Sequence, residues 1–250
     1  MDNEYIEKVR SNLGGVLSRI RDASGGREVK LLLATKTVPP EVINYVSENF
    51  GISLIGENKV QELLEKYGEL DTEHLHIHFI GYLQTNKVKQ IIDKVEMIHS
   101  VDRLSLAQEI SKRARAIGKK MPILVEINIA KEEQKSGVMP DDAEEFIKSI
   151  VSLEGIAIKG LMTMAPARIS SEQYKEYFRE TKELLERIKA LDIEGVEMET
   201  LSMGMSESYT EGVECGATVV RVGSAIFGKR AYPEKNTEER EGLNDADFQQ

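Results

Sequence analysis

Short apolar runs alternate along the chain with longer segments in which apolar and charged residues recur at helical spacing. The runs are rich in Val, Ile and Leu and predict strands at 29–35, 52–56, 76–80, 95–99, 122–129, 156–163, 196–202 and 217–222. The longer segments predict helices at 3–22, 40–50, 58–70, 86–94, 102–118, 141–152, 171–190 and 206–215.

Strict alternation of strands and helices is typical of a parallel sheet that is buried on both faces. Eight such units in 250 residues predict the α/β class, as a single (β/α)8 TIM barrel with an additional N-terminal helix. An open doubly wound sheet is the alternative. We expect one domain over 1–230, followed by a polar, acidic tail over 231–250 that is loosely ordered.

Two of the predicted helices begin with capping signals. Asp102 is placed to cap the helix that follows it, and Ser170 stands before Glu172 and Gln173 at the start of the helix 171–190. Both signals support the strand–helix order of the predicted barrel.

A barrel carries its active site at the carboxyl ends of its strands, and polar residues gather there in this sequence. Lys36 follows the first apolar run directly, where the surrounding apolar residues would partly desolvate it. Burial lowers the pKa of a lysine, and the neutral amine can then form a Schiff base with a carbonyl substrate or with pyridoxal phosphate. The alternative is a lysine that extends to solvent at a strand end.

Residues after the seventh and eighth strands favour a Schiff-base lysine over a lysine that extends to solvent. Gly223 and Ser224 follow the eighth strand, where backbone N–H groups can approach a phosphate, and Ser202 ends the seventh. Taken singly, the glycine would be an ordinary turn and the serine a helix cap. Of the histidines at 74, 76 and 78, only His78 lies well inside the apolar run, so we interpret them as core or rim residues and predict no metal site.

The amino-acid composition limits the classes of partner that the protein can bind. The net charge of −10 argues against nucleic acid or an anionic membrane as the main partner. The longest stretch without Asp, Glu, Lys or Arg, 74–86, is too short and polar to span a bilayer. Cys215 is the only cysteine, so no intrachain disulfide can form, and we expect a cytoplasmic protein.

Several motifs together resemble a known family. The chain is similar to the YggS/PROSC group of pyridoxal phosphate homeostasis proteins, which share the barrel of the fold-type III alanine racemases. The resemblance covers about residues 5–230 and rests on ATKTVP (34–39), IGENKVQE (55–62), HFIGYLQTNK (78–87), SVDR (100–103), EINIAKEEQKSG (126–137), GLMTMAP (160–166), LSMGMS (201–206) and VRVGSAIFG (220–228).

The resemblance implies pyridoxal 5'-phosphate as the cofactor and a role for each matching position. Lys36 would hold the cofactor as a Schiff base, and Arg221 would face the pyridine nitrogen. The remaining cofactor-binding residues would be Ser202, Gly223 and Ser224 at the phosphate, with Asn58 and Asn128 around the ring. Ser224 stands where relatives often have threonine, a change that keeps the hydroxyl. Because arginine cannot protonate the pyridine nitrogen, the ring would be a weak electron sink.

Three functions fit these residues. We expect a non-catalytic protein that buffers pyridoxal phosphate or delivers it to apo-enzymes, with amino acids as weak ligands. The alternatives are an amino-acid racemase of low activity, using Lys36 and either water or a tyrosine such as Tyr82 or Tyr209, and a Schiff-base aldolase. We expect the separate β-domain of the racemases, with its dimer contacts, to be absent, and therefore a monomer.

Overall fold

The computed structural model describes residues 2–228 and contains a closed barrel of eight parallel strands in sequence order. All eight predicted strands are confirmed. They are β1 (Lys30–Ala34), β2 (Leu54–Glu57), β3 (His76–Phe79), β4 (Met97–Val101), β5 (Met121–Ile127), β6 (Ile156–Thr163), β7 (Val196–Ser202) and β8 (Val219–Val222). The barrel excludes the open-sheet alternative, and the tail predicted at 231–250 lies outside the described residues.

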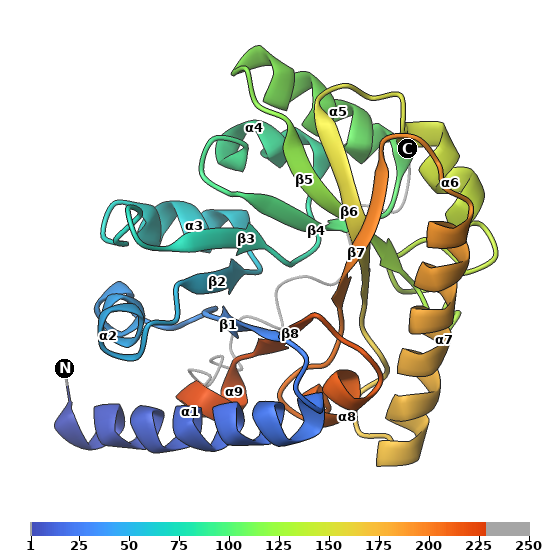
Figure 1. Ribbon diagram of the computed structural model, residues 1–250. Coiled ribbons are helices and arrows are strands. Elements are labelled where there is room, and N and C mark those ends of the chain that lie inside the picture. The colour runs from blue at the N-terminus through green and yellow to red at the C-terminus, as the bar shows by residue number, and fades with distance from the viewer. Residues whose placement is uncertain (1, 229–250) are drawn as a thin grey trace, which may run out of the picture.

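Helices cover the outside of the barrel, and those from α2 to α8 connect successive strands (Figure 1). They are α1 (Asn3–Ser24), α2 (Pro40–Phe50), α3 (Val60–Tyr67), α4 (Val88–Ile91), α5 (Leu104–Ala116), α6 (Ala143–Ile150), α7 (Ser171–Ala190), α8 (Tyr209–Glu214) and α9 (Ser224–Phe227). The segment predicted as a helix at 86–94 is a 3-10 turn, η1 (Thr85–Lys87), continued by the single turn of α4. The short α9 was not predicted, since its four residues are too few to show periodicity.

The two capping predictions had different outcomes. Ser170 and Gln173 form a reciprocal capping box at the start of α7, as predicted. The predicted cap by Asp102 is wrong: Arg103 occupies the cap position of α5, without a side-chain cap. Asp102 instead pairs with the Arg103 guanidinium at 2.6 Å, and this ion pair takes the carboxylate that would have capped the helix.

The main core lies between the outer face of the barrel and the helices. Strand residues such as Leu33, Ile55 and Val220 are fully buried there against helix residues such as Ile43 and Leu63. A second, smaller cluster combines Leu32, Ile80 and Val219, with Ala34 and Leu54 packed against it. Because side chains alternate along a strand, this second cluster belongs to the barrel interior.

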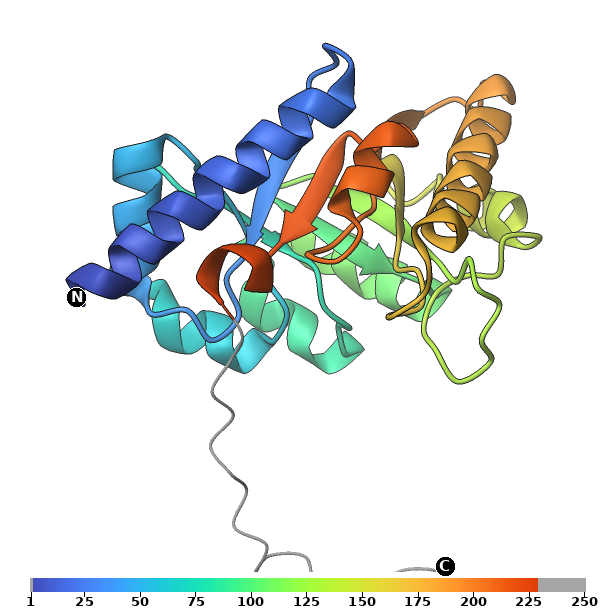
Figure 2. The same ribbon diagram turned by 90° about the horizontal axis from the view of Figure 1, so that it is seen from below.

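The N-terminal helix completes the outer layer beside β8. α1 packs against α8 and α9 (Figures 1 and 2), and it buries Ile6, Val9, Leu13 and Val16. Asn12 Nδ2 donates to the Ile226 carbonyl at 2.9 Å, which fixes α1 to α9. Since α9 has a single turn, α1 covers surface that a longer eighth helix would otherwise cover. No helix within 2–228 is long and apolar enough to cross a membrane.

One glycine permits a close approach between two strands. Gly160 lies in β6, where the pairing register with both β5 and β7 shifts, and its φ is +151°. A Cβ atom at this position would lie 1.8 Å from the Thr200 carbonyl oxygen of β7. Only glycine allows the two backbones to come this close.

We therefore expect Gly160→Ala to lower the free energy of unfolding by roughly 2–4 kcal/mol, because two backbone segments must separate. Gly14→Ala is the matched control: Gly14 lies in the middle of α1, and a Cβ there meets nothing within 4 Å. That substitution should stabilise the protein by about 0.5–1 kcal/mol. Urea unfolding measures both; equal effects of the two substitutions would contradict the close approach.

Candidate functional site

Lys36 lies in a short turn directly after β1, at the carboxyl end of the barrel. Its side chain is half-buried, whereas Thr35 before it is fully buried. Thr37 after it has a φ of +63°, in the left-handed region that a β-branched residue rarely adopts. The lysine therefore stands in a turn that the surrounding structure must hold.

Strand pairing brings the end of the chain's eighth strand to this turn. Leu32 pairs with Arg221, and Leu33 pairs with Val222, so Gly223 follows beside Ala34. A Cβ atom on Gly223 would lie 2.8 Å from the Ala34 carbonyl oxygen, so a side chain there would be crowded by the end of β1. The predicted lysine and the predicted phosphate-binding glycine are therefore neighbours.

Arg221 is buried inside the barrel, with 3% of its surface exposed. Its Nη1 donates to Ser202 Oγ at 2.7 Å, and its Nη2 donates to the Thr163 carbonyl at 3.0 Å. Burial lowers the pKa of Arg221 to about 10, while the nearby charge of Glu126 raises it, so the guanidinium stays protonated at neutral pH. These contacts fix the orientation of a permanent positive charge.

A chain of hydrogen bonds continues from Arg221 across the barrel interior. Ser202 Oγ lies 3.1 Å from His99 Nδ1, and His99 Nε2 lies 2.9 Å from His78 Nδ1. Burial, with the charges of His76 and Lys30, lowers the pKa of His78 to about 4. Burial, with the charges of His78 and Arg221, lowers the pKa of His99 well below its usual value. Both imidazoles are therefore neutral at pH 7.

Backbone N–H groups converge beside the start of α9. The Gly223 and Ala225 N–H groups both donate to Ser206 Oγ, each at 3.2 Å. Two donors directed at one oxygen atom form a cradle of the kind that binds a phosphate oxygen. Ser224 lies between these two residues and begins α9.

The two predicted asparagines have different surroundings. Asn58 follows β2, and its side-chain Oδ1 is buried without a hydrogen-bond partner among residues 2–228. The Asn128 side chain donates to the Glu132 carbonyl at 2.8 Å and accepts from the Glu132 N–H at 3.1 Å, which organises the loop after β5. That Asn128 also lines a cofactor ring stays a prediction.

Three residues of this region were not among the sequence predictions. Ser206 accepts the two converging N–H groups, while His99 and Thr163 contact the Ser202–Arg221 pair. Ser206 lies within the LSMGMS motif, but the sequence alone does not show that its hydroxyl accepts two backbone N–H groups. His99 lies within an apolar run, where a lone histidine resembles a core residue. In the described part of the chain, no three His, Cys, Asp or Glu side chains are grouped to hold a metal.

The neutral histidines make stability depend on pH. In the unfolded chain a histidine takes up a proton near pH 6.5, whereas the folded protein keeps His99 and His78 neutral to lower pH. The unfolded state therefore binds more protons below about pH 6.5, and stability falls as the pH falls. Each histidine contributes up to about 2 kcal/mol of this loss between about pH 6.5 and 5.

We expect His99→Gln to lose less stability than the parent protein when the pH falls from about 7 to about 5. Denaturant unfolding at several pH values measures the difference. His74→Gln is the control for removing a histidine from the surface. A parent protein and a His99→Gln variant with the same pH slope would contradict a neutral, buried His99.

The fold and the sequence both match known proteins. The family model for the alanine racemase N-terminal domain matches residues 11–231. A pyridoxal phosphate homeostasis protein of Aquifex aeolicus is 43% identical over 225 residues, which cover 88% of this chain and 97% of that protein.

Two solved structures extend the comparison. A crystal structure from Bifidobacterium adolescentis is 33% identical, with a TM-score of 0.85 over 90% of this chain and 97% of that one. The structure of PipY from Synechococcus elongatus with PLP bound is 28% identical, with a TM-score of 0.78 over 88% of this chain and all of PipY (100%). In both comparisons the likeness covers nearly the full length of both chains, and therefore the whole barrel. The chain belongs to the alanine racemase N-terminal domain family and, within it, to the pyridoxal phosphate homeostasis proteins.

Proposed function

We propose that this protein binds pyridoxal 5'-phosphate through Lys36 and serves the homeostasis of that cofactor. The cofactor and the role are those in the names of its relatives, and PipY has been solved with PLP bound. The observation that carries the proposal here is a juxtaposition. The turn of Lys36, the buried Arg221 and the N–H groups of Gly223 and Ala225 meet where β1 pairs with β8.

The residues at this place fit the chemical groups of the cofactor. When bound, pyridoxal phosphate supplies an aldehyde that reacts reversibly with an amine and a pyridine ring that withdraws electrons. Lys36 would supply the amine. Gly223, Ser224, Ser206 and Ser202 would supply N–H and hydroxyl donors to the phosphate, as Gly223 and Ala225 already do to Ser206 Oγ.

Arg221 would face the pyridine nitrogen in this proposal. Ser202 and the Thr163 carbonyl accept two of the five N–H groups of a guanidinium, which fixes its orientation. A protonated arginine donates to the ring nitrogen without transferring a proton to it. The ring is therefore a weak electron sink, which suits racemase-like chemistry or storage better than transamination.

The racemase alternative lacks support at the residue it would need. Racemisation requires an acid and a base on opposite faces of the substrate carbon. The Tyr209 hydroxyl accepts from Arg19 of α1 at 3.4 Å, and its side chain is buried under that helix. Tyr82 is 58% exposed, and the Arg103 guanidinium lies 4.9 Å from its ring centroid. Neither tyrosine is held toward Lys36 by these contacts.

We also propose binding partners, an oligomeric state and a cellular compartment for this protein. Apo-enzymes that need pyridoxal phosphate would receive it from this protein, and amino acids would bind weakly by competing with Lys36 for the cofactor. A cytoplasmic monomer suits this exchange, and the single cysteine, Cys215, fits a reducing compartment.

Adding pyridoxal phosphate to the parent protein should give a visible absorption band, and borohydride reduction should attach the cofactor to Lys36, as located by peptide mass spectrometry. Lys36→Ala should lose both signals. Lys59→Ala is the control, since Lys59 is an exposed lysine that follows Asn58. Covalent attachment that persists in Lys36→Ala would refute the assignment of the lysine.

The loaded protein should restore activity to an apo-enzyme that requires pyridoxal phosphate, and it should produce no D-amino acid from L-alanine over the same time. The physical reason for the second outcome is that neither Tyr209 nor Tyr82 is held toward Lys36 as a second acid–base group. Chiral chromatography and a reactivation assay measure the two outcomes. Steady accumulation of D-alanine would favour the racemase instead.

A further inference from the structure

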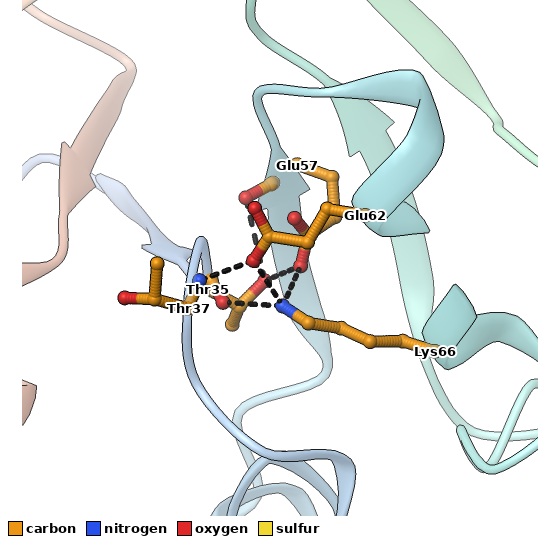
Figure 3. A network of polar contacts seen from close by, with 6 residues as sticks. Thr35, Thr37, Glu57, Glu62 and Lys66 are labelled. Atoms are coloured by element: carbon orange, nitrogen blue, oxygen red, sulfur yellow. Dashed lines mark hydrogen bonds and ion pairs between the residues drawn. The ribbon is translucent and has the colours of Figure 1, made fainter. Parts of the chain in front are cut away.

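A buried cluster of charged side chains lies beside the Lys36 turn (Figure 3). It joins Lys66 of α3 to Glu62 of the same helix and to Glu57 at the end of β2. The Lys66 ammonium lies 3.1 Å from Glu57 Oε1 and 2.8 Å from Glu62 Oε1. Lys66 is 8% exposed and Glu57 is 0% exposed, so this ion pair is shielded from solvent.

The cluster binds the residue before Lys36 at two points. Lys66 Nζ donates to the Thr35 carbonyl at 2.8 Å, and Thr35 Oγ1 donates to Glu57 Oε1 at 2.6 Å. The Thr35 N–H donates to the Gly56 carbonyl at 3.1 Å. The N–H, carbonyl and hydroxyl of Thr35 are therefore all fixed, and two of these contacts come from the charged side chains.

The cluster also binds the residue after Lys36. The Thr37 N–H donates to Glu62 Oε1, the same oxygen that accepts from Lys66 (Figure 3). Burial tends to raise the pKa of Glu62, but the hydrogen bonds from Lys66 and Thr37 outweigh it and lower that pKa, which keeps the acceptor charged. The left-handed Thr37, with its φ of +63°, is thus held by a carboxylate that Lys66 holds in turn.

We propose that Lys66, Glu57 and Glu62 are positioning residues that set the direction of Lys36 toward its cofactor by clamping the residues on either side of it. The inference rests on the proposed function of Lys36. No member of the cluster needs to touch the cofactor, because each acts through the backbone of Thr35 or Thr37.

Removing the clamp should slow covalent binding without abolishing it. Glu62 is the best position for substitution, because its side chain is more exposed than those of Glu57 and Lys66. Glu62→Ala removes the acceptor for Thr37, while Glu62→Gln keeps an oxygen acceptor and removes the charge. We expect Glu62→Ala to slow formation of the Lys36 bond by about tenfold, the effect of one hydrogen bond to a charged group, and Glu62→Gln to restore most of the rate.

Lys66→Met provides a second variant, in which the ammonium is lost and the stem remains. Its matched control is Lys119→Met: the half-buried Lys119 Nζ donates to the Val95 carbonyl at 2.5 Å, in the loops before β4 and β5, at the opposite end of the barrel. Both substitutions should lower stability, but only Lys66→Met should slow the reaction with pyridoxal phosphate. Equal rates in the two variants would overturn the proposal.

Amide hydrogen exchange of the cofactor-free protein tests the clamp without the cofactor. Exchange at Thr37 should accelerate at least about tenfold in Glu62→Ala and stay near the parent rate in Glu62→Gln. Unchanged exchange and unchanged binding kinetics in Glu62→Ala would refute the clamp and leave the proposed function intact. A parent protein that forms no covalent bond at Lys36 would refute the proposed function, and the inference with it.

Discussion

The pairing of β1 with β8 is the constraint on which the candidate site depends. The two strands are separated by almost the whole chain, and closure of the barrel places Lys30 opposite Val219 and Leu33 opposite Val222. A register shift of one residue would turn Arg221 from the interior to the helical layer, because side chains alternate between faces. The lysine turn, the arginine and the converging N–H groups therefore share one location only because the barrel closes in this register.

Placing the Arg221 side chain inside the barrel is unfavourable for the stability of the fold. An arginine with 3% of its surface exposed loses most of its hydration, and the lowered pKa of Arg221, about 10, reflects that loss. Ser202, the Thr163 carbonyl and the charge of Glu126 offset it in part. Most barrels fill this space with branched apolar side chains, whereas here the apolar cluster of Leu32, Ile80 and Val219 is small. The fold therefore loses some stability, and the candidate site gains a positive charge in a fixed orientation.

The sequence predicts the barrel well and its site unevenly. The strands alternate with charged, helix-like segments, so the pattern of apolar residues locates all eight, and Lys36 and Gly223 follow from their places after strands. The contacts of Ser202 and the role of Ser206 do not follow, since they depend on which hydroxyl a neighbouring strand approaches. Asp102 fails as a cap because the adjacent Arg103 competes for its carboxylate, and spacing alone cannot weigh that competition.

Holding a cofactor and catalysing with it place different demands on the same lysine. A catalyst needs a second acid–base group across the substrate carbon and a ring that accepts electrons. Tyr209, one candidate for that second group, accepts a hydrogen bond from Arg19 of α1. What the structure does provide is a turn fixed on both sides of Lys36 by Glu57, Glu62 and Lys66. A fixed amine loses less entropy when a covalent bond forms on it, so a turn held on both sides favours formation of that bond at Lys36.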